Sequence, residues 1–190
     1  MIAMQALPPI PSWTELHPLV IHFPIALLLV APLFIVAGII VNPQKGRPFL
    51  IAALVLMLLG TAGAFLAIAT GEAAGEVAER TPAVNAVLER HEDLAEMTRI
   101  VFTVLSLLFA AILFLPRFLK REPSGLTARI LPLAFLLFYS AGAVILVNTA
   151  HNGGRLVHEL DVHAGITEST GTSQSPASEQ PVAQEADAEH

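Results

Sequence analysis

The chain has 190 residues, of which 54% are hydrophobic and 14% are charged, and its formal net charge is −6. Soluble domains carry about 25% charged residues, so this deficit indicates an integral membrane protein. The absence of cysteine excludes disulfides, thiolate metal ligands, iron–sulfur clusters and haem attached through a C-x-x-C-H motif. The acidic excess lies in loops and tail, which argues against nucleic-acid binding. We expect no cleavable signal, because the first sixteen residues contain neither Lys nor Arg.

Four hydrophobic runs are long enough to cross a bilayer, because about 20 helical residues span a hydrocarbon core of about 30 Å. They are expected at about 17–41, 48–70, 100–116 and 130–150. The fold class is therefore an all-α integral membrane protein, a four-transmembrane-helix bundle. We expect residues 1–16 to form an N-terminal segment, residues 17–165 the transmembrane domain, and residues 166–190 a disordered acidic and polar tail.

Basic residues predict the orientation of this bundle. Six of the ten Lys and Arg residues lie between the first two runs or between the last two, namely Lys45, Arg47, Arg117, Lys120, Arg121 and Arg129. By the positive-inside rule, these two connections face the cytoplasm. Both termini and segment 71–98 are then periplasmic, in the inner membrane of a Gram-negative bacterium.

The third run is preceded by a polar segment with a helical pattern. Thr81 and Pro82 have the character of an N-cap and a first-turn proline. Apolar residues then follow at helical spacing, which predicts one continuous helix over 82–116 whose first half projects above the bilayer. Small residues at 60, 63 and 64 and at 141–143 predict close helix packing in the second and fourth runs.

Six histidines before the tail fall on the predicted periplasmic side, and none falls in a connection predicted to be cytoplasmic. The six are His17, His22, His91, His151, His158 and His163. The orientation was derived from Lys and Arg alone, so this distribution is an independent observation. His22 lies about 7.5 Å below the start of the first helix. Pro24 cannot donate to the carbonyl of Val20, and we expect the resulting kink to turn the imidazole of His22 toward the bundle interior. An ionisable side chain at that depth is a candidate functional residue.

The fourth run ends in "TAHNGGRLVHEL", residues 149–160. We expect Gly153 and Gly154 to end the helix, because glycine suits a left-handed cap. The chain would then reverse along the membrane surface and carry His158 above the bundle. Asn148 and His151 are three residues apart and share a helix face. A glycine cap before an interfacial segment and a ligand-binding turn both fit this pattern.

Three motifs carry a family resemblance: "LHPLVIHFPIALL", the pair His91-Glu92, and "HNGGRLVHEL". Over roughly residues 14–165 the chain resembles the bacterial membrane family catalogued as domain of unknown function twenty-two thirty-one. The resemblance implies four helices and a partnership with c-type cytochromes or other respiratory components. The motif positions in this chain are His17, Pro18, His22, Pro24, His91, His151, Gly153 and Gly154. The family more often has a Tyr followed by His-Gly after the double glycine, where this chain has His158 and His163-Ala164.

The first of three functional interpretations is a membrane b-type cytochrome. Two axial imidazoles can hold haem without a covalent link, and helix bundles supply such pairs. The pattern supports one haem near the periplasmic face, held by His22 with His91 or His151. The wider set of candidate cofactor-binding residues includes His17 and Arg155, with Arg90, Arg99 or Arg155 near the propionates.

The second interpretation is a Zn or Cu site formed by His22, His91 and His151, because imidazole suits both metals. The third is a cofactor-free structural subunit of a larger membrane complex. No motif indicates an enzyme, since the chain has no nucleophile motif, no phosphate loop and no carboxylate pair within a span. The lipid bilayer is the expected environment, and the oligomeric state is left open.

Overall fold

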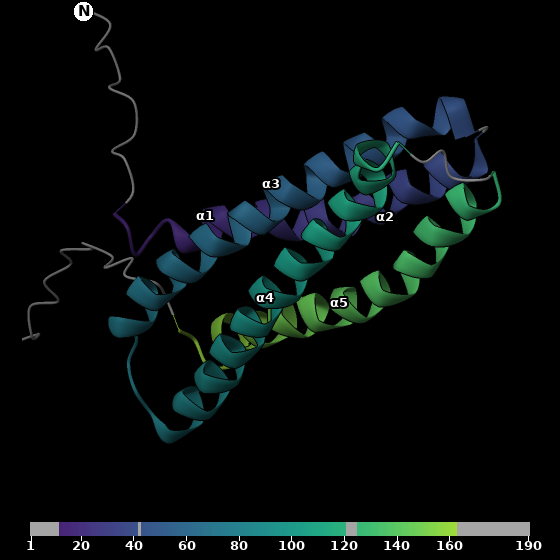
Figure 1. Ribbon diagram of the computed structural model, residues 1–190. Helices are drawn as coiled ribbons and strands as arrows, with labels where there is room; N and C mark the ends of the chain where they lie inside the picture. The colour runs from purple at the N-terminus through teal and green to yellow at the C-terminus, as the bar shows by residue number, and fades with distance from the viewer. Residues whose placement is uncertain (1–11, 42, 121–124, 163–190) are drawn as a thin grey trace, which may run out of the picture.

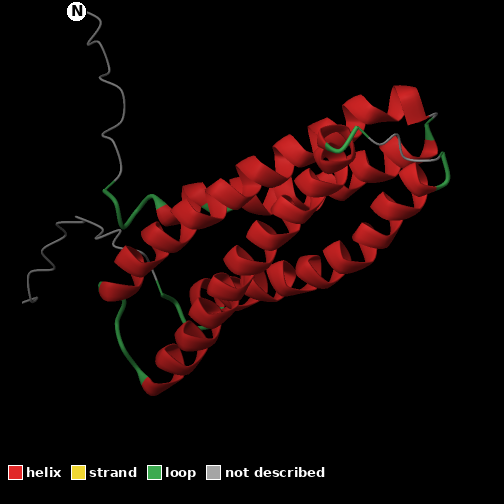
Figure 2. Ribbon diagram, viewed as in Figure 1, coloured by secondary structure: helices red, strands yellow, loops and turns green. Residues whose placement is uncertain are grey.

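In the computed structural model, the described residues are 12–41, 43–120 and 125–162. The expected disordered tail and His163 lie outside them. The described part contains helices and short connections but no strands, and its elements are α1 (His17–Val20), α2 (His22–Ile40), α3 (Pro43–Glu76), α4 (Pro82–Phe118) and α5 (Thr127–His158). Four stretches are long and apolar enough to span a membrane, because α1 and α2 together form the first. The prediction of an all-α, four-span protein is confirmed (Figure 2).

The helices form one bundle with all connections at its two ends. In Figure 1, α1, the α3–α4 connection and the end of α5 lie toward the left, and the other two connections lie toward the right. Helix α2 packs mainly on α3, and α4 packs on both α5 and α3. Contacts between α2 and α5 close the bundle. This arrangement brings His17, at the start of α1, to the same end as the close of α5.

Two boundaries differ from the expected ones. Helix α3 begins at Pro43 rather than near Pro48, so Lys45 and Arg47 lie in its first turns rather than in a loop. It also continues beyond Thr70 to Glu76. The added turns contain Gly71 and Gly75, and both pack on side chains of other helices, which stabilises the extension.

Helix α4 is continuous over 37 residues, as predicted. The side chain of Thr81 accepts a hydrogen bond from the backbone N–H of Val84 at 3.2 Å, and Pro82 occupies the first turn. The hydroxyl thus satisfies one of the N–H groups that a helix leaves unpaired at its start. At 1.5 Å per residue the helix is about 55 Å long, well beyond a hydrocarbon core of about 30 Å.

The prediction that Gly153 and Gly154 end the fourth helix is wrong. Helix α5 runs through both glycines to His158, so residues 155–158 continue the helix, and the chain turns only after it, where the N–H of Val162 bonds the carbonyl of Leu156. A helical glycine costs only about 1 kcal/mol relative to alanine. Here Leu156, one turn beyond, is buried with Val84 and Leu88 of α4. Burial of a leucine contributes about 1.5–3 kcal/mol, enough to offset a glycine.

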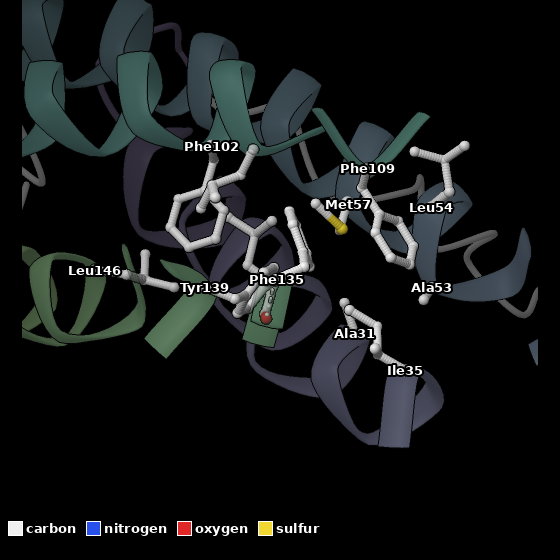
Figure 3. Close-up of a cluster of buried hydrophobic side chains, with 12 residues drawn as sticks. Ala31, Ile35, Ala53, Leu54, Met57, Phe102, Phe109, Phe135, Tyr139 and Leu146 are labelled. Atoms are coloured by element: carbon white, nitrogen blue, oxygen red, sulfur yellow. Dashed lines mark hydrogen bonds between the residues drawn. The ribbon is translucent and has the colours of Figure 1, made fainter. Parts of the chain in front are cut away.

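The core lies at mid-bundle and joins all four spans. Figure 3 shows Phe135 and Tyr139 of α5 beside Phe102 and Phe109 of α4, with Met57 of α3 facing them. Phe109 stacks on Phe135 with ring centroids 4.7 Å apart, and Phe102 meets Tyr139 edge-on at 5.4 Å. This aromatic contact holds α4 and α5 at a fixed spacing.

Small residues allow the close helix packing that the sequence predicted. A Cβ at Gly60 would lie 2.7 Å from Leu28, and one at Gly63 would lie 3.2 Å from Pro24, so α2 and α3 approach closely there. On α5, a Cβ at Gly142 would lie 3.0 Å from Leu105 of α4.

Candidate functional site

His17 lies at the start of α1 and faces α3. Its Nδ1 is 3.2 Å from the hydroxyl of Thr70, a residue that is fully buried. The ring packs on Gly71, where a Cβ would come within 2.9 Å of Cε1. Only glycine at this position lets the imidazole lie so close to the backbone of α3.

His91 occupies the same kind of environment between α4 and α5. Its Nδ1 is 2.9 Å from the backbone carbonyl oxygen of Thr149. A carbonyl can only accept, so this nitrogen carries the hydrogen, and in the neutral ring Nε2 has the free lone pair. The ring packs on Gly153, where a Cβ would lie 3.0 Å from Cε1.

The two histidine environments match closely. The distances from the glycine Cβ position to Cε1, Nδ1 and Nε2 are 2.9, 3.3 and 3.6 Å for His17, and 3.0, 3.4 and 3.7 Å for His91. Each ring therefore has an oxygen at Nδ1 and a glycine along its Cε1 edge. We call the six residues of this arrangement the histidine layer: His17, Thr70, Gly71, His91, Thr149 and Gly153.

The histidine layer is compact and polar. A Cβ at Gly75 of α3, one turn beyond Gly71, would lie 3.6 Å from Oε1 of Glu92, the neighbour of His91 on α4, so the two histidines lie at a similar level of the bundle. The hydroxyl oxygen of Thr149 lies 2.9 Å from the carbonyl of Ile145, 3.1 Å from that of Leu94 and 2.8 Å from the hydroxyl of Thr98. These hydrogen bonds hold the side chains of Thr98 and Thr149 in place between α4 and α5.

His22 does not face the bundle interior, contrary to expectation. The helix is interrupted next to it, at Ile21 between α1 and α2, so the predicted irregularity is present. The imidazole is exposed and its Nδ1 is 2.7 Å from the carbonyl of Pro18 on the preceding turn. His17, not His22, points into the bundle, where it contacts Thr70 and Gly71, and Pro24 is buried against Gly63.

The other predicted residues lie apart from this interior. His151 and His158 are exposed on α5. Arg155 bonds through Nε to Glu159 at 2.9 Å. Arg99 pairs with Glu96 and lies 5.1 Å over the ring of Phe65, and Arg90 is exposed.

The structure does not assemble His22, His91 and His151 into a metal site. Across the described ranges there is no group of three or more His, Asp or Glu side chains that could hold a metal ion. Two open surface depressions, one along α5 and one beside the α3–α4 connection, are lined by residues other than histidine. The functional candidate is thus a pair of histidines rather than a triad.

Sequence reasoning identified His17, His91 and Gly153 but missed Thr70, Gly71 and Thr149. The sequence places Thr70 and Gly71 at the end of a predicted span and the start of a polar segment. The adjacent pair could have indicated a contact site, because Thr70 offers a hydroxyl and Gly71, which has no side chain, leaves space beside it for a ring. Nothing in the sequence indicated that His17 of α1 would occupy the space beside Gly71.

Comparison with known proteins supports one assignment. A family model described as "Predicted membrane protein (DUF2231)" matches residues 14–165. No curated protein and no solved structure shows significant similarity to the chain.

Proposed function

The chain belongs to the DUF2231 family of predicted membrane proteins, and from its histidine layer we propose a redox subunit of the bacterial inner membrane that binds one b-type haem through His17 and His91. The observation that carries the proposal is the pair of imidazoles, each held at Nδ1 by an oxygen of a neighbouring helix. The assignment replaces His22 and His151 as axial ligands, because both present exposed side chains.

The number of histidines favours haem over Zn or Cu. Haem iron takes two axial ligands from the protein. Zinc sites take three or four protein ligands, and no group of three is found among the described residues. His17 and His91 therefore fit an iron already held by a porphyrin better than a free metal ion.

The hydrogen bonds at Nδ1 also fit a ligand role. Histidines that bind metals usually donate their other ring N–H to a carbonyl or another oxygen, which fixes the ring and raises the basicity of the ligating nitrogen. The Thr149 carbonyl is such a partner for His91. Bound haem would supply one-electron chemistry. The protein would hold the two rings, and the apolar core below them would keep water out.

The partners follow from where this site lies. The start of α1, the end of α3 and the end of α5, which carry most of the histidine layer, lie at the end of the bundle that has the α3–α4 connection (Figure 1). The positive-inside rule assigns this end to the periplasm. An electron-transfer partner would then be periplasmic, such as a c-type cytochrome or another respiratory component.

The optical spectrum of the detergent-solubilised full-length protein tests this proposal. We expect a Soret band and a b-type pyridine haemochrome, with about one haem per chain. His17→Ala and His91→Ala should lose the haem, whereas His22→Ala should retain it, because His22 is exposed and bonds only its own helix turn. His151→Ala is a second control.

Three results would contradict the proposal. Loss of haem from His22→Ala but not from His17→Ala would place the ligands elsewhere. A colourless preparation with stoichiometric Zn or Cu by elemental analysis would favour the metal interpretation. A colourless, metal-free preparation would leave a structural subunit whose histidines tie α1 to α3 and α4 to α5.

A further inference from the structure

Thr70 stands where α1 meets α3, and its hydroxyl is the partner of Nδ1 of His17. A neutral imidazole has one N–H and one lone pair, and the bond made by one nitrogen decides the role of the other. The direction of the Thr70–His17 bond therefore decides which nitrogen of His17 can bind a metal. A hydroxyl can donate or accept, so the surroundings of Thr70 determine this direction.

The surroundings of Thr70 favour a hydroxyl hydrogen directed away from His17. Its Oγ1 lies 3.0 Å from the carbonyl of Leu66 and 3.1 Å from that of Ala67, and neither carbonyl can donate. Threonines within helices commonly make this bond to the preceding turn. Because the hydroxyl has one hydrogen, Oγ1 is left to accept from Nδ1 of His17. The carbonyl of Ala67 is a second acceptor near the ring.

His91 provides an independent comparison within the molecule. Its Nδ1 faces a backbone carbonyl, which forces the N–H onto that nitrogen. The glycine contacts of the two rings agree within 0.1 Å at all three ring atoms. A matched pair of rings with the same tautomer would present two Nε2 lone pairs.

We infer that Thr70 is a positioning residue that holds His17 in the Nδ1–H tautomer, so that Nε2 is the nitrogen offered to the iron. The consequence for iron binding rests on the proposed haem site, whereas the tautomer itself does not. Without the hydroxyl, the Nδ1–H of His17 loses its side-chain acceptor, and the ring is free to protonate at Nε2 or to turn from Gly71. Both changes remove the ligand nitrogen.

The first test is ¹⁵N NMR of the full-length protein, labelled at histidine, with the His17 signals assigned from their absence in His17→Ala. We expect Nδ1 of His17 to be protonated in the wild type and in Thr70→Ser. In Thr70→Val, which keeps the shape of the side chain, we expect this pattern to be lost. Protonation at Nε2 in the wild type, or an unchanged pattern in Thr70→Val, would overturn the inference.

The second test measures haem dissociation. Loss of such a hydrogen-bond partner weakens metal binding by about 10- to 100-fold, and we expect a loss in that range for Thr70→Val but not for Thr70→Ser. Thr61→Val is the matched control, because Thr61 is also a buried threonine of α3 but bonds Ser106 and Phe102. Equal losses in Thr70→Val and Thr61→Val would show a general packing effect and overturn the positioning role.

The two tests separate this inference from the proposed function. A wild-type protein without haem but with Nδ1–H at His17 would refute the haem site and leave the role of Thr70 standing. A haem-loaded wild type whose Thr70→Val variant binds haem normally would refute only the role of Thr70.

Discussion

Gly153 and Gly154 are adjacent on α5 but have different surroundings. A Cβ at Gly153 would lie 3.0 Å from Cε1 of His91, whereas one at Gly154 would meet no atom within 4 Å. Alanine is favoured over glycine within a helix by about 1 kcal/mol. Gly154→Ala should therefore raise the free energy of unfolding by up to about 1 kcal/mol, measured by thermal or denaturant unfolding in detergent.

Gly153→Ala gains the same helix propensity but crowds the ring of His91, which must shift by a few tenths of an ångström and thereby strains its bond to the Thr149 carbonyl. A buried donor that loses its partner costs about 1–3 kcal/mol. We expect Gly153→Ala to be less stable than Gly154→Ala by about this amount, and to lose haem where Gly154→Ala retains it. Equal stability of the two variants would show that the glycine contact does not hold His91 in place.

Sequence reasoning at this scale identified the histidines but not their directions. His17 and His22 are five residues apart, which is about 140° around a helix of 3.6 residues per turn, so only one of them can face the interior. The depth of His22 favoured it over His17. The choice is made by tertiary contacts with Thr70 and Gly71, which lie 53 and 54 residues away from His17 in the chain, and local spacing carries no information about them.

A hydrogen bond joins α5 to α2 at a carbonyl that a proline leaves without its usual backbone donor. Pro32 lies inside α2 and has no N–H to donate to the carbonyl of Leu28, four residues earlier. The buried hydroxyl of Tyr139 donates to that carbonyl instead, at 2.6 Å. An unpaired carbonyl in a membrane interior is costly, so this contact both satisfies α2 and attaches it to α5.

Tyr139→Phe should destabilise the bundle, because the Leu28 carbonyl then has no donor. We expect a loss of about 1–3 kcal/mol in the free energy of unfolding in detergent, above the average of about 0.6 kcal/mol for side-chain hydrogen bonds between membrane helices.

A double-mutant cycle with Pro32 tests whether the cost of Tyr139→Phe comes from the missing backbone donor. Pro32→Ala restores a backbone N–H at the position that can bond Leu28, so Tyr139→Phe should cost less in that background. We expect a coupling energy of about 1 kcal/mol. If Tyr139→Phe costs the same with and without Pro32, the tyrosine does not replace the missing backbone donor.

Sequence signals for the start or end of a helix predicted the helix boundaries correctly where tertiary packing favoured the same boundary. The Thr81-Pro82 start and the apolar spacing that follows gave α4 as one helix, and the structure confirms it. The Gly153-Gly154 pair is an equally strong local signal for a helix end, yet α5 continues to His158. The difference is tertiary, because Leu156 gains burial against α4 only if the helix goes on.

At the scale of the whole molecule, four spans place the α3–α4 connection and the α4–α5 connection at opposite ends of the bundle (Figure 1). The packing of the helices against one another would be the same in either orientation of the bundle in the membrane, so it does not indicate which end is periplasmic. Orientation depends instead on the distribution of Lys and Arg, which predicts that residues 77–81 are periplasmic and that the α4–α5 connection is cytoplasmic.

Because the chain contains no cysteine, single substitutions can test this orientation without a background signal. Glu79 and Gly125 are both exposed, one in each connection. We expect a membrane-impermeant maleimide to label Glu79→Cys in intact spheroplasts and Gly125→Cys only after the membrane is opened. Leu107 is exposed in the middle of α4, and we expect Leu107→Cys to face lipid and resist labelling in both conditions. The reverse pattern for Glu79→Cys and Gly125→Cys would place the histidine layer at the cytoplasmic face, so that any electron partner would have to be cytoplasmic.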